Sequence, residues 1–454
     1  MLNSTILGLS TILLAGSPFS MAPVSGSRTF SVDKSLFTRS IHNLFYFNIF
    51  TGNAKFSKTT FDNIIGGAIR VDSAYDAKDQ VIEKRYAPNI MSQNFYSFES
   101  CMFRNCHISG EKFNGGAVSI NVPAGKDFDV DISFEFSSFY NCYAAGGQGG
   151  ALYGYRIGDV SLLETCFSMC FTREQSSTGD TGTGTAVYLH HRASTERTKS
   201  RGSSYDRCPP QAAMYPNTES VFYVMMGKVD FDHSNFTNNV VEQGSSAICL
   251  VEQKYCNIDF TSCINCIGEN TIHIVGQTDA SCDINTVNFV NCANHSEAKE
   301  LYGVVAVLYT QITLDDSVFI MGDNKFLAIR DQKDTTSKIT FNKCTFDRAQ
   351  NQLSDTSICD FKSCAFGTQD PKTNKFTYFD SRECWEINPD RLPASNTVYA
   401  FFIFFALFCG IVGFGIYLQV TQVLCGEAVV STNYDAAPAI SEPINNAQYD
   451  TLPE

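Results

Sequence analysis

The sequence predicts an all-β ectodomain, folded as a parallel β-helix, followed by one C-terminal transmembrane helix. Short alternating apolar segments recur between turns of Gly, Asn and Ser, no long amphipathic helical pattern interrupts them, and one uncharged apolar run lies near the C-terminus. The 454 residues include 33 Lys plus Arg and 47 Asp plus Glu, a net charge of -14. This acidity argues against an extended nucleic-acid surface, so we expect no nucleic-acid partner.

A secretory signal peptide is predicted for residues 1–26. Residues 1–16 hold an apolar run too short to span a membrane, and small residues and prolines follow it, as is typical of such signals. Cleavage is expected after Gly16 or after Gly26. Because no Lys or Arg precedes the run, an apolar first strand of the fold is the alternative.

A transmembrane helix is predicted for residues 398–420. They carry no charge, and about 20 residues rising 1.5 Å each cross a hydrocarbon core of roughly 30 Å. The run is apolar on all sides, unlike a core helix, and the polar residues 421–454 that follow are unlike the end of a GPI signal. We therefore expect a single-pass plasma-membrane protein, with residues 27–390 outside as the β-helix ectodomain and residues 421–454 as a cytoplasmic tail.

The cysteines support an extracytoplasmic ectodomain. The chain has 18, and all except Cys409 and Cys425 precede residue 390. Thiols in this number are typical of an oxidising compartment. The tail lacks Lys and Arg, against the positive-inside rule, and we give the cysteine distribution more weight. No Cys/His cluster has metal-ligand spacing, so neither a metal nor a cofactor is expected.

One short pattern, F-x-x-[CS]-x-F-x-N-[CN], recurs along the chain. Its clearest copies are residues 98–106, 134–142, 231–239 and 341–349. Looser copies occupy residues 56–64, 162–170, 260–266, 284–292, 314–322 and 361–369. Successive copies lie mostly roughly 20 to 36 residues apart, which suits one coil of a solenoid rather than a separate domain.

A second pattern, a glycine pair and an alanine before an apolar residue, alternates with the first. It occurs at residues 66–69, 115–118 and 149–152, with degenerate forms at residues 184–187, 245–248 and 304–307. In stacked coils, equivalent positions lie about 4.8 Å apart, so a recurring residue becomes a ladder. We expect an internal aromatic stack of Phe103, Phe139, Phe167, Phe236, Phe289, Phe346 and Phe366. We also expect a hydrogen-bonded turn ladder of Asn63, Asn105, Asn141, Asn238 and Asn291.

The alternation of GGA[ILV] and F-x-x-N motifs over roughly residues 40–385 resembles the repeats of the polymorphic outer-membrane protein family, known from chlamydial adhesins and from trichomonad surface proteins. The resemblance implies a right-handed parallel β-helix displayed at a cell surface and, as in several members, adhesion to host cells. A single predicted helix stands where the bacterial form has a C-terminal barrel translocator. The chain thus resembles the membrane-anchored, trichomonad-type form.

This resemblance favours binding over catalysis. We expect a surface adhesin or host-interaction protein whose partner is a host-cell or extracellular-matrix ligand, with a glycan as one option. Asp315 and Asp316 are the only adjacent aspartates, no polygalacturonase-type motif surrounds them, and the seven histidines share no motif, so no catalytic residue is assigned. A membrane-anchored polysaccharide lyase or hydrolase is one alternative, because many β-helix proteins act on polysaccharides, and a structural coat protein is another.

The coil register also suggests disulfide candidates. Cysteines recur at one repeat position in Cys106, Cys142 and Cys170, in Cys266 and Cys292, and at another position in Cys344 and Cys364. A coil spacing of about 4.8 Å lies within the Cα range of a disulfide. Buried free thiols are the alternative. Cys263 and Cys266 form a C-x-x-C without further ligands, which we interpret as structural.

Three further segments carry specific expectations. Residues 190–220 are predicted to form a polar loop inserted in the β-helix, basic enough to contact anionic glycans or a partner, with a merely solvated loop as the alternative. Sequons make Asn235 and Asn294 glycosylation candidates. In the tail, Tyr449 and Leu452 resemble an internalisation signal for a cytoplasmic sorting adaptor, with an incidental tyrosine in a disordered tail as the alternative.

Overall fold

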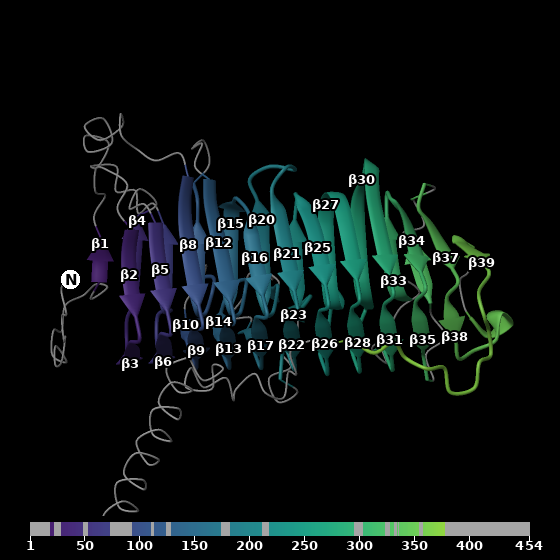
Figure 1. The fold of residues 1–454 in the computed structure, drawn as a ribbon, viewed down its shortest axis with the longest axis horizontal. Helices are drawn as coiled ribbons and strands as arrows, with labels where there is room; N and C mark the ends of the chain where they lie inside the picture. The colour runs from purple at the N-terminus through teal and green to yellow at the C-terminus, as the bar shows by residue number, and fades with distance from the viewer. Residues whose placement is uncertain are drawn as a thin grey trace, which may run out of the picture. The chain divides into compact units, whose positions relative to one another are not determined.

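The computed structural model is all-β and built from long parallel sheets, which confirms the predicted class (Figure 1). It describes residues 19–21, 29–48, 53–72, 93–109, 113–123, 129–173, 182–210, 218–294, 303–322, 327–330, 334, 336–353 and 357–376. These belong to a compact unit of residues 1–391, and a second unit, residues 392–454, lies outside the described residues. Each described strand pairs in parallel with its counterpart one coil further on, which is the arrangement of a β-helix.

Two rows of strands form the widest sheet (Figure 1). Row A contains β1 (Phe19–Met21), β4 (Phe45–Asn48), β7 (Ile69–Asp72), β11 (Val118–Asn121), β15 (Leu152–Ile157), β20 (Val187–His191), β24 (Phe222–Met225), β33 (Gly303–Leu308) and β36 (Ala328–Arg330). Row B contains β2 (Thr29–Asp33), β5 (Asn53–Ser57), β8 (Gln93–Glu99), β12 (Asp129–Glu135), β16 (Val160–Leu163), β21 (Arg197–Arg201), β25 (Lys228–Asp232), β34 (Gln311–Asp315), β37 (Lys338–Asn342) and β39 (Cys359–Lys362). The long strands β27 (Ser245–Asp259) and β30 (Asn270–Asn285) run through both rows.

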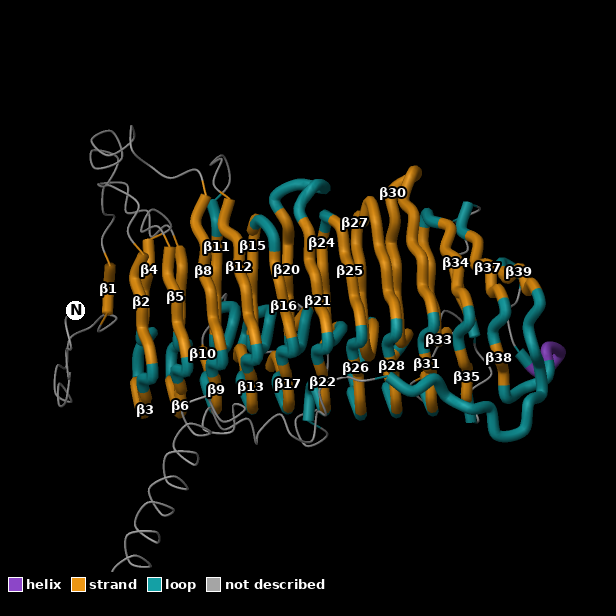
Figure 2. The backbone as a smooth tube through the Cα atoms, viewed as in Figure 1, coloured by secondary structure: helices purple, strands orange, loops and turns teal. Residues whose placement is uncertain are grey.

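Row C is a separate, 11-stranded sheet. It contains β3 (Leu36–Ser40), β6 (Thr60–Ile64), β9 (Met102–Arg104), β13 (Ser138–Tyr140), β17 (Cys166–Ser168), β22 (Ser204–Asp206), β26 (Asn235–Thr237), β28 (Ser262–Ile264), β31 (Asn288–Val290), β35 (Val318–Ile320) and β38 (Thr345–Phe346). Short strands follow it in some coils: β10 (His107–Ser109), β14 (Tyr143–Ala145), β18 (Phe171–Arg173), β19 (Gly182–Thr183), β23 (Thr218–Glu219), β29 (Ile267–Gly268) and β32 (Ala293–Asn294). A 3-10 turn, η4 (Gln350–Gln352), lies near the C-terminal end (Figure 2).

Each coil has two corners: the first corner joins row B to row C, and the second corner follows row C and leads into the rest of the coil. Each places one residue in the left-handed backbone region, for example Lys58 at φ 49° in the first corner and Asn105 at φ 52° in the second. Asn tolerates this region better than other residues with a side chain, which explains the Asn of the repeat. The glycine pairs precede row A where the backbones of adjacent coils approach closely, since a Cβ added to Gly150 would clash with the Thr185 carbonyl oxygen.

The interior is filled by the predicted aromatic stack. Ring centroids lie 4.7 Å apart for Phe103 and Phe139 and 4.6 Å apart for Phe139 and Phe167, with nearly parallel rings. Tyr205 and Phe319, which the repeat pattern did not include, continue the same row, and Cys263 interrupts it between Phe236 and Phe289. Buried stacked rings remove large apolar areas from water in every coil, so the hydrophobic core runs along the axis of the solenoid.

The prediction of an inserted loop at residues 190–220 is wrong for most of the residues that the structure describes there. Arg197–Arg201 form β21 and Ser204–Asp206 form β22, which add one more coil to rows B and C. In β21 the charged side chains alternate outward while Thr198 and Ser200 are buried. Arg197, Lys199 and Arg201 therefore belong to a strand rather than an inserted loop.

The predicted ends of the chain are largely outside the described residues. Within residues 1–26, Phe19–Met21 form β1 and pair with β4 in parallel, so cleavage after Gly16 keeps this strand and cleavage after Gly26 removes it. The described part contains no helix long and apolar enough to cross a membrane. The predicted span, residues 398–420, and the tail with Tyr449 and Leu452 fall outside that part.

Candidate functional site

A groove with a volume of about 540 Å³ follows the second corner across the first coils. Four coils contribute to it in the same way, each with its left-handed corner residue and the residue two positions later. The corner residues are Arg39, Asn63, Asn105 and Asn141, and their partners two positions on are Ile41, Ile65, His107 and Tyr143. The groove therefore has one polar wall and one mainly apolar wall, built by the repeat itself.

The polar wall is an amide ladder. The side-chain nitrogen of Asn141 donates to Oδ1 of Asn105 at 2.7 Å, and that of Asn63 donates to Asp62 Oδ2 at 2.9 Å. All three asparagines have φ between 50° and 55°, so the corner has the same left-handed backbone in each of these coils. A row of aligned amides offers donors and acceptors at coil spacing, about 4.8 Å.

An ion pair supports this wall from row C. Arg104 donates from Nε to Asp62 Oδ1 at 2.8 Å and from Nη2 to Oδ2 at 3.0 Å, a two-pronged contact. The hydrogen bond from Arg104 is the main reason why the pKa of Asp62 lies below its usual value. Asp62 therefore stays charged and holds both Arg104 and Asn63 in place.

The apolar wall contains a stacked strip of rings. His107 and Tyr143 stack with centroids 4.7 Å apart, and Tyr143 and Phe171 follow at 4.8 Å. Beyond His107 the strip continues with Ile65 and Ile41, which are 43% and 62% exposed. Exposed aliphatic side chains beside an amide ladder suit a ligand with alternating apolar and hydroxyl-bearing faces, such as a carbohydrate chain.

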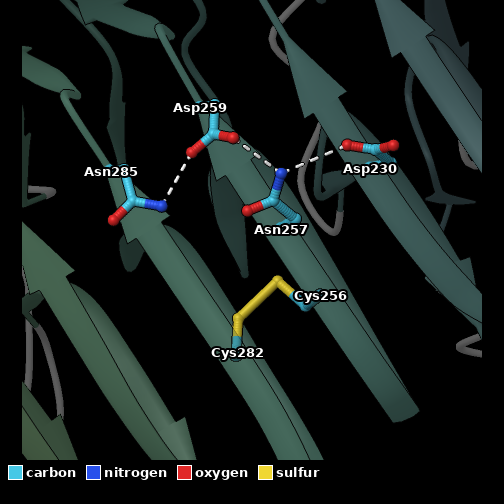
Figure 3. The surroundings of a disulfide bond; sticks show 6 residues. All are labelled: Asp230, Cys256, Asn257, Asp259, Cys282 and Asn285. Atoms are coloured by element: carbon cyan, nitrogen blue, oxygen red, sulfur yellow. Dashed lines mark hydrogen bonds between the residues drawn. A yellow bond between two sulfur atoms is a disulfide. The ribbon is translucent and has the colours of Figure 1, made fainter.

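A second polar surface lies on row B, around the Cys256–Cys282 disulfide (Figure 3). Asn257 donates to Asp230 at 3.3 Å and to Asp259 at 2.7 Å, and Asn285 donates to the other oxygen of Asp259 at 2.8 Å. The carboxylates thus accept hydrogen bonds from neighbouring amides across the coils. Within the described part of the chain, no group of three His, Cys, Asp or Glu residues is arranged to hold a metal ion.

Asp315 and Asp316, the adjacent aspartates considered for catalysis, have different structural roles. Asp315 ends β34 and accepts a hydrogen bond from Asn342, whereas Asp316 is the left-handed residue of the first corner, at φ 47°. His191, the most buried histidine of the 190–220 segment, contacts the Gly158 carbonyl through Nδ1 at 2.8 Å and Thr198 through Nε2 at 2.7 Å. Because a carbonyl only accepts, Nδ1 carries the proton, and burial lowers the pKa of His191 to about 4. It is a neutral structural residue.

The disulfide candidates are corrected by the structure. Cys106, Cys142, Cys266, Cys292, Cys344 and Cys364 form no disulfide with one another, whereas Cys256 and Cys282, whose Cα atoms lie 4.4 Å apart in adjacent coils, form a bridge. The candidates do stack in register, but their sulfurs face backbone carbonyls. Cys142 Sγ lies 3.4 Å from the Phe103 oxygen, and Cys344 Sγ lies 3.3 Å from the Leu314 oxygen.

Cys344 and Cys364 occupy a position that hydroxyl side chains fill in other coils. Ser137 and Thr165 donate there to a carbonyl of the previous coil, at 3.2 Å and 3.1 Å. The thiols replace these hydroxyls as donors at the first corner. Burial raises the pKa of Cys344 to about 12, so this thiol stays protonated and unreactive.

The two sequons differ in what the structure shows of them. Asn235 begins β26 and is only 3% exposed, which leaves no room for a glycan in the folded protein, so this candidate is wrong for the native state. Asn294 lies in β32, paired with Gly268, and its side chain is outside the described part.

No protein-family model, curated protein or solved structure matches the chain. The interpretation of the groove therefore depends on its geometry alone. Sequence reasoning named three of its residues, Asn63, Asn105 and Asn141, as a structural ladder, and did not identify the apolar wall. The signal was present in the repeat, because His107 and Tyr143 occur at one fixed offset from the corner asparagine.

Proposed function

We propose that the chain is a membrane-anchored cell-surface protein whose right-handed β-helix ectodomain binds a ligand and performs no catalysis, as an adhesin or host-interaction protein does. The groove at the second corner is the binding site, and a glycan on a host cell or in the extracellular matrix is its ligand class. The alternating repeats support membership of the polymorphic outer-membrane repeat family. The uncharged run at residues 398–420 supports the single-pass anchor at the plasma membrane, and Tyr449 with Leu452 supports a cytoplasmic sorting adaptor.

The observation that carries this proposal is the regular two-walled groove. Arg39, Asn63, Asn105 and Asn141 place one polar side chain per coil along the groove, and the exposed Ile41 and Ile65 lie beside them. A ligand that itself repeats, such as a polysaccharide, can make the same contact several times, and each repeated contact adds to affinity without further ordering of the protein.

Catalysis has less support than binding. Asp230 and Asp259 of row B accept hydrogen bonds from the amides of Asn257 and Asn285, which fixes these carboxylates in a structural network (Figure 3). Other row B aspartates, such as Asp232 with Arg201, are held in ion pairs. A structural coat protein needs no exposed apolar wall, whereas Ile41 and Ile65 are exposed.

The test uses the full-length chain on the surface of expressing cells. These cells are offered a panel of soluble glycans and monolayers of host cells, each with and without calcium, and the glycan solution is then analysed for cleavage products. We expect saturable binding without cleavage. Cleavage products would favour the lyase or hydrolase alternative, and absence of both binding and cleavage would favour the coat protein.

A further inference from the structure

The first described coil has two strands without a neighbour on their outer side. Among the described strands, β2 pairs only with β5 and β3 pairs only with β6, and Figure 1 shows both at one end of the stack. The outer edge of a strand carries backbone N–H and C=O groups that point away from its one partner. Neither strand contains a proline, so both edges can accept a further strand.

The same end exposes apolar side chains. Leu36 in β3 is 69% exposed and Ile41, just after this strand, is 62% exposed, the two largest values among the large apolar residues that the structure describes. Phe30 and Val32 of β2 pack on the core but are only partly buried. Exposed apolar side chains beside an unpaired strand edge mark an interaction site.

The last described coil ends in the same manner. β39 pairs only with β37 among the strands that the structure describes, and Figure 1 shows it at the opposite end from β2. Phe361 of β39 and Phe366 pack on the core and are only partly buried. The chain then leaves this end, because the Asn374 backbone nitrogen donates to Oδ1 of Asn288, in an earlier coil, at 2.9 Å. The described residues after β39 therefore leave its outer edge unpaired.

The register makes the two ends of the stack complementary. Strand pairings traced from β2 to β39 place Val32 and Phe361 at the same inward position of row B. Pairings from β3 onward place Leu36 and Ala365 at the same first position of row C, where Ala365 bridges to Thr345. A second copy added beyond β39 would therefore continue both rows with its own β2 and β3, in register and with every strand parallel. Between β38 and β39 the turn η4 takes the place of a row A strand, so the continuation concerns rows B and C.

Charges at the two ends are also complementary. Asp33 and Lys362 share one outward position of row B. In the middle of the solenoid this position holds an ion pair, with Arg201 Nε 3.2 Å from Asp232 Oδ2 in the next coil. Asp33 is exposed, and the Lys362 side chain is 60% exposed with one long contact to Asp360 at 3.8 Å.

We propose that this chain associates with a second copy of itself head to tail, with β2 and β3 of one copy pairing in parallel with β39 and residues 365–366 of the other. Asp33 of one copy then faces Lys362 of the second copy, and Leu36 is covered. The contact joins two different surfaces, so it repeats from copy to copy instead of closing as a two-fold dimer. Neither Leu36 nor Asp33 lines the groove, so the contact is separate from the proposed function. Where that function holds, successive copies present several grooves to one repeating ligand.

Sedimentation velocity of the purified full-length chain in mild detergent tests the association over protein concentrations of about 1–100 µM. We expect an average mass that rises with concentration. Leu36→Glu is expected to weaken the association at least about tenfold, because it places a charge in the covered contact. The matched variant Phe95→Glu, whose side chain is 43% exposed on row B away from both ends, is expected to associate like the wild type. A wild-type chain that stays monomeric throughout, or equal association by the two variants, would overturn the proposal.

An exchange of charges tests the direction of the contact. Asp33→Lys and Lys362→Asp each place like charges at the junction, so each single variant is expected to associate about fivefold more weakly than the wild type. The double variant restores opposite charges at every junction and is expected to recover the wild-type association. Weakening by Asp33→Lys alone, with Lys362→Asp unchanged, would indicate a contact between two N-terminal ends and would contradict the head-to-tail pairing. Failure of the double variant to recover, with its circular dichroism unchanged, would contradict it as well.

Discussion

The side-chain amide of Asn141 donates to the side-chain oxygen of Asn105, in the adjacent coil of the solenoid, at 2.7 Å. Both residues have left-handed backbones, with φ 50° and 52°. One residue type therefore serves three purposes at this corner: it permits the turn, links adjacent coils and forms the polar wall of the groove.

The corner predicts a specific order of stability among variants of Asn141. Asn141→Ala removes the side-chain hydrogen bond and leaves a residue with a Cβ in the left-handed region, which alanine tolerates less well than asparagine. We expect it to lower the free energy of unfolding by about 1–2 kcal/mol. Asn141→Gly loses the same hydrogen bond but accepts the backbone conformation, so its loss is expected to be smaller. Urea denaturation measures both, and an alanine variant more stable than the glycine variant would contradict this account of the corner.

The aromatic stack predicts a large effect of truncation at Phe139. Phe139 is fully buried between Phe103 and Phe167, so Phe139→Ala should lower the free energy of unfolding by about 3–5 kcal/mol. Phe95 is 43% exposed on row B and provides the matched control, since Phe95→Ala is expected to change stability by less than about 1 kcal/mol. Equal losses in the two variants would show that the stack does not form the core.

The free thiol at Cys344 predicts that serine replaces it better than alanine. Serine occupies the equivalent position at Ser137 and donates to the same kind of carbonyl, so Cys344→Ser is expected to lose less than about 1 kcal/mol, and Cys344→Ala to lose more. In the unfolded wild-type protein, alkylation should label both Cys344 and Cys364 without reduction. Recovery of a Cys344–Cys364 linked peptide would restore the disulfide that the coil register first suggested.

The buried His191 predicts a loss of stability in mild acid. The pKa of this imidazole is about 4 in the folded protein and about 6.5 in an unfolded chain, so the unfolded state binds the proton first. The contribution is fully present above pH 6.5 and is lost as the pH falls toward 4, by roughly 3 kcal/mol. Chemical denaturation between pH 7.5 and 4 measures the slope. His191→Asn should reduce the slope without removing it, because burial also lowers the pKa of His273 to about 4. An unchanged slope in the His191 variant would show that His191 does not contribute to the acid sensitivity.

Sequence periodicity predicted the coils and most of the aromatic stack because each is a local pattern repeated in register. The asparagine ladder is confirmed in two separate parts, Asn105 with Asn141 and Asn238 with Asn265 and Asn291, because Met169 and Arg207 take the corner between them. The coil of β22 was missed because Tyr205 replaces the repeat Phe and Arg207 replaces the corner Asn. The predicted disulfide pairs were wrong because the register shows which cysteines lie in equivalent positions of adjacent coils but not where their sulfurs point. The direction of each sulfur depends on the carbonyl that it contacts, such as that of Leu314 for Cys344. The contact between Asn374 and Asn288 joins residues far apart in sequence and has no periodic signal.

The most direct test of the proposed function compares glycan and host-cell binding by three forms of the full-length chain displayed on cells. The groove variant carries Asn105→Gly and Asn141→Gly, which remove two amides and keep the left-handed corners. The control carries Asn265→Gly, at the same corner position with φ 52° and in the same kind of ladder, but outside the groove. We expect the groove variant to bind at least about tenfold more weakly and the control to bind like the wild type. Equal binding by all three forms, at equal surface levels, would contradict the assignment of the groove as the binding site.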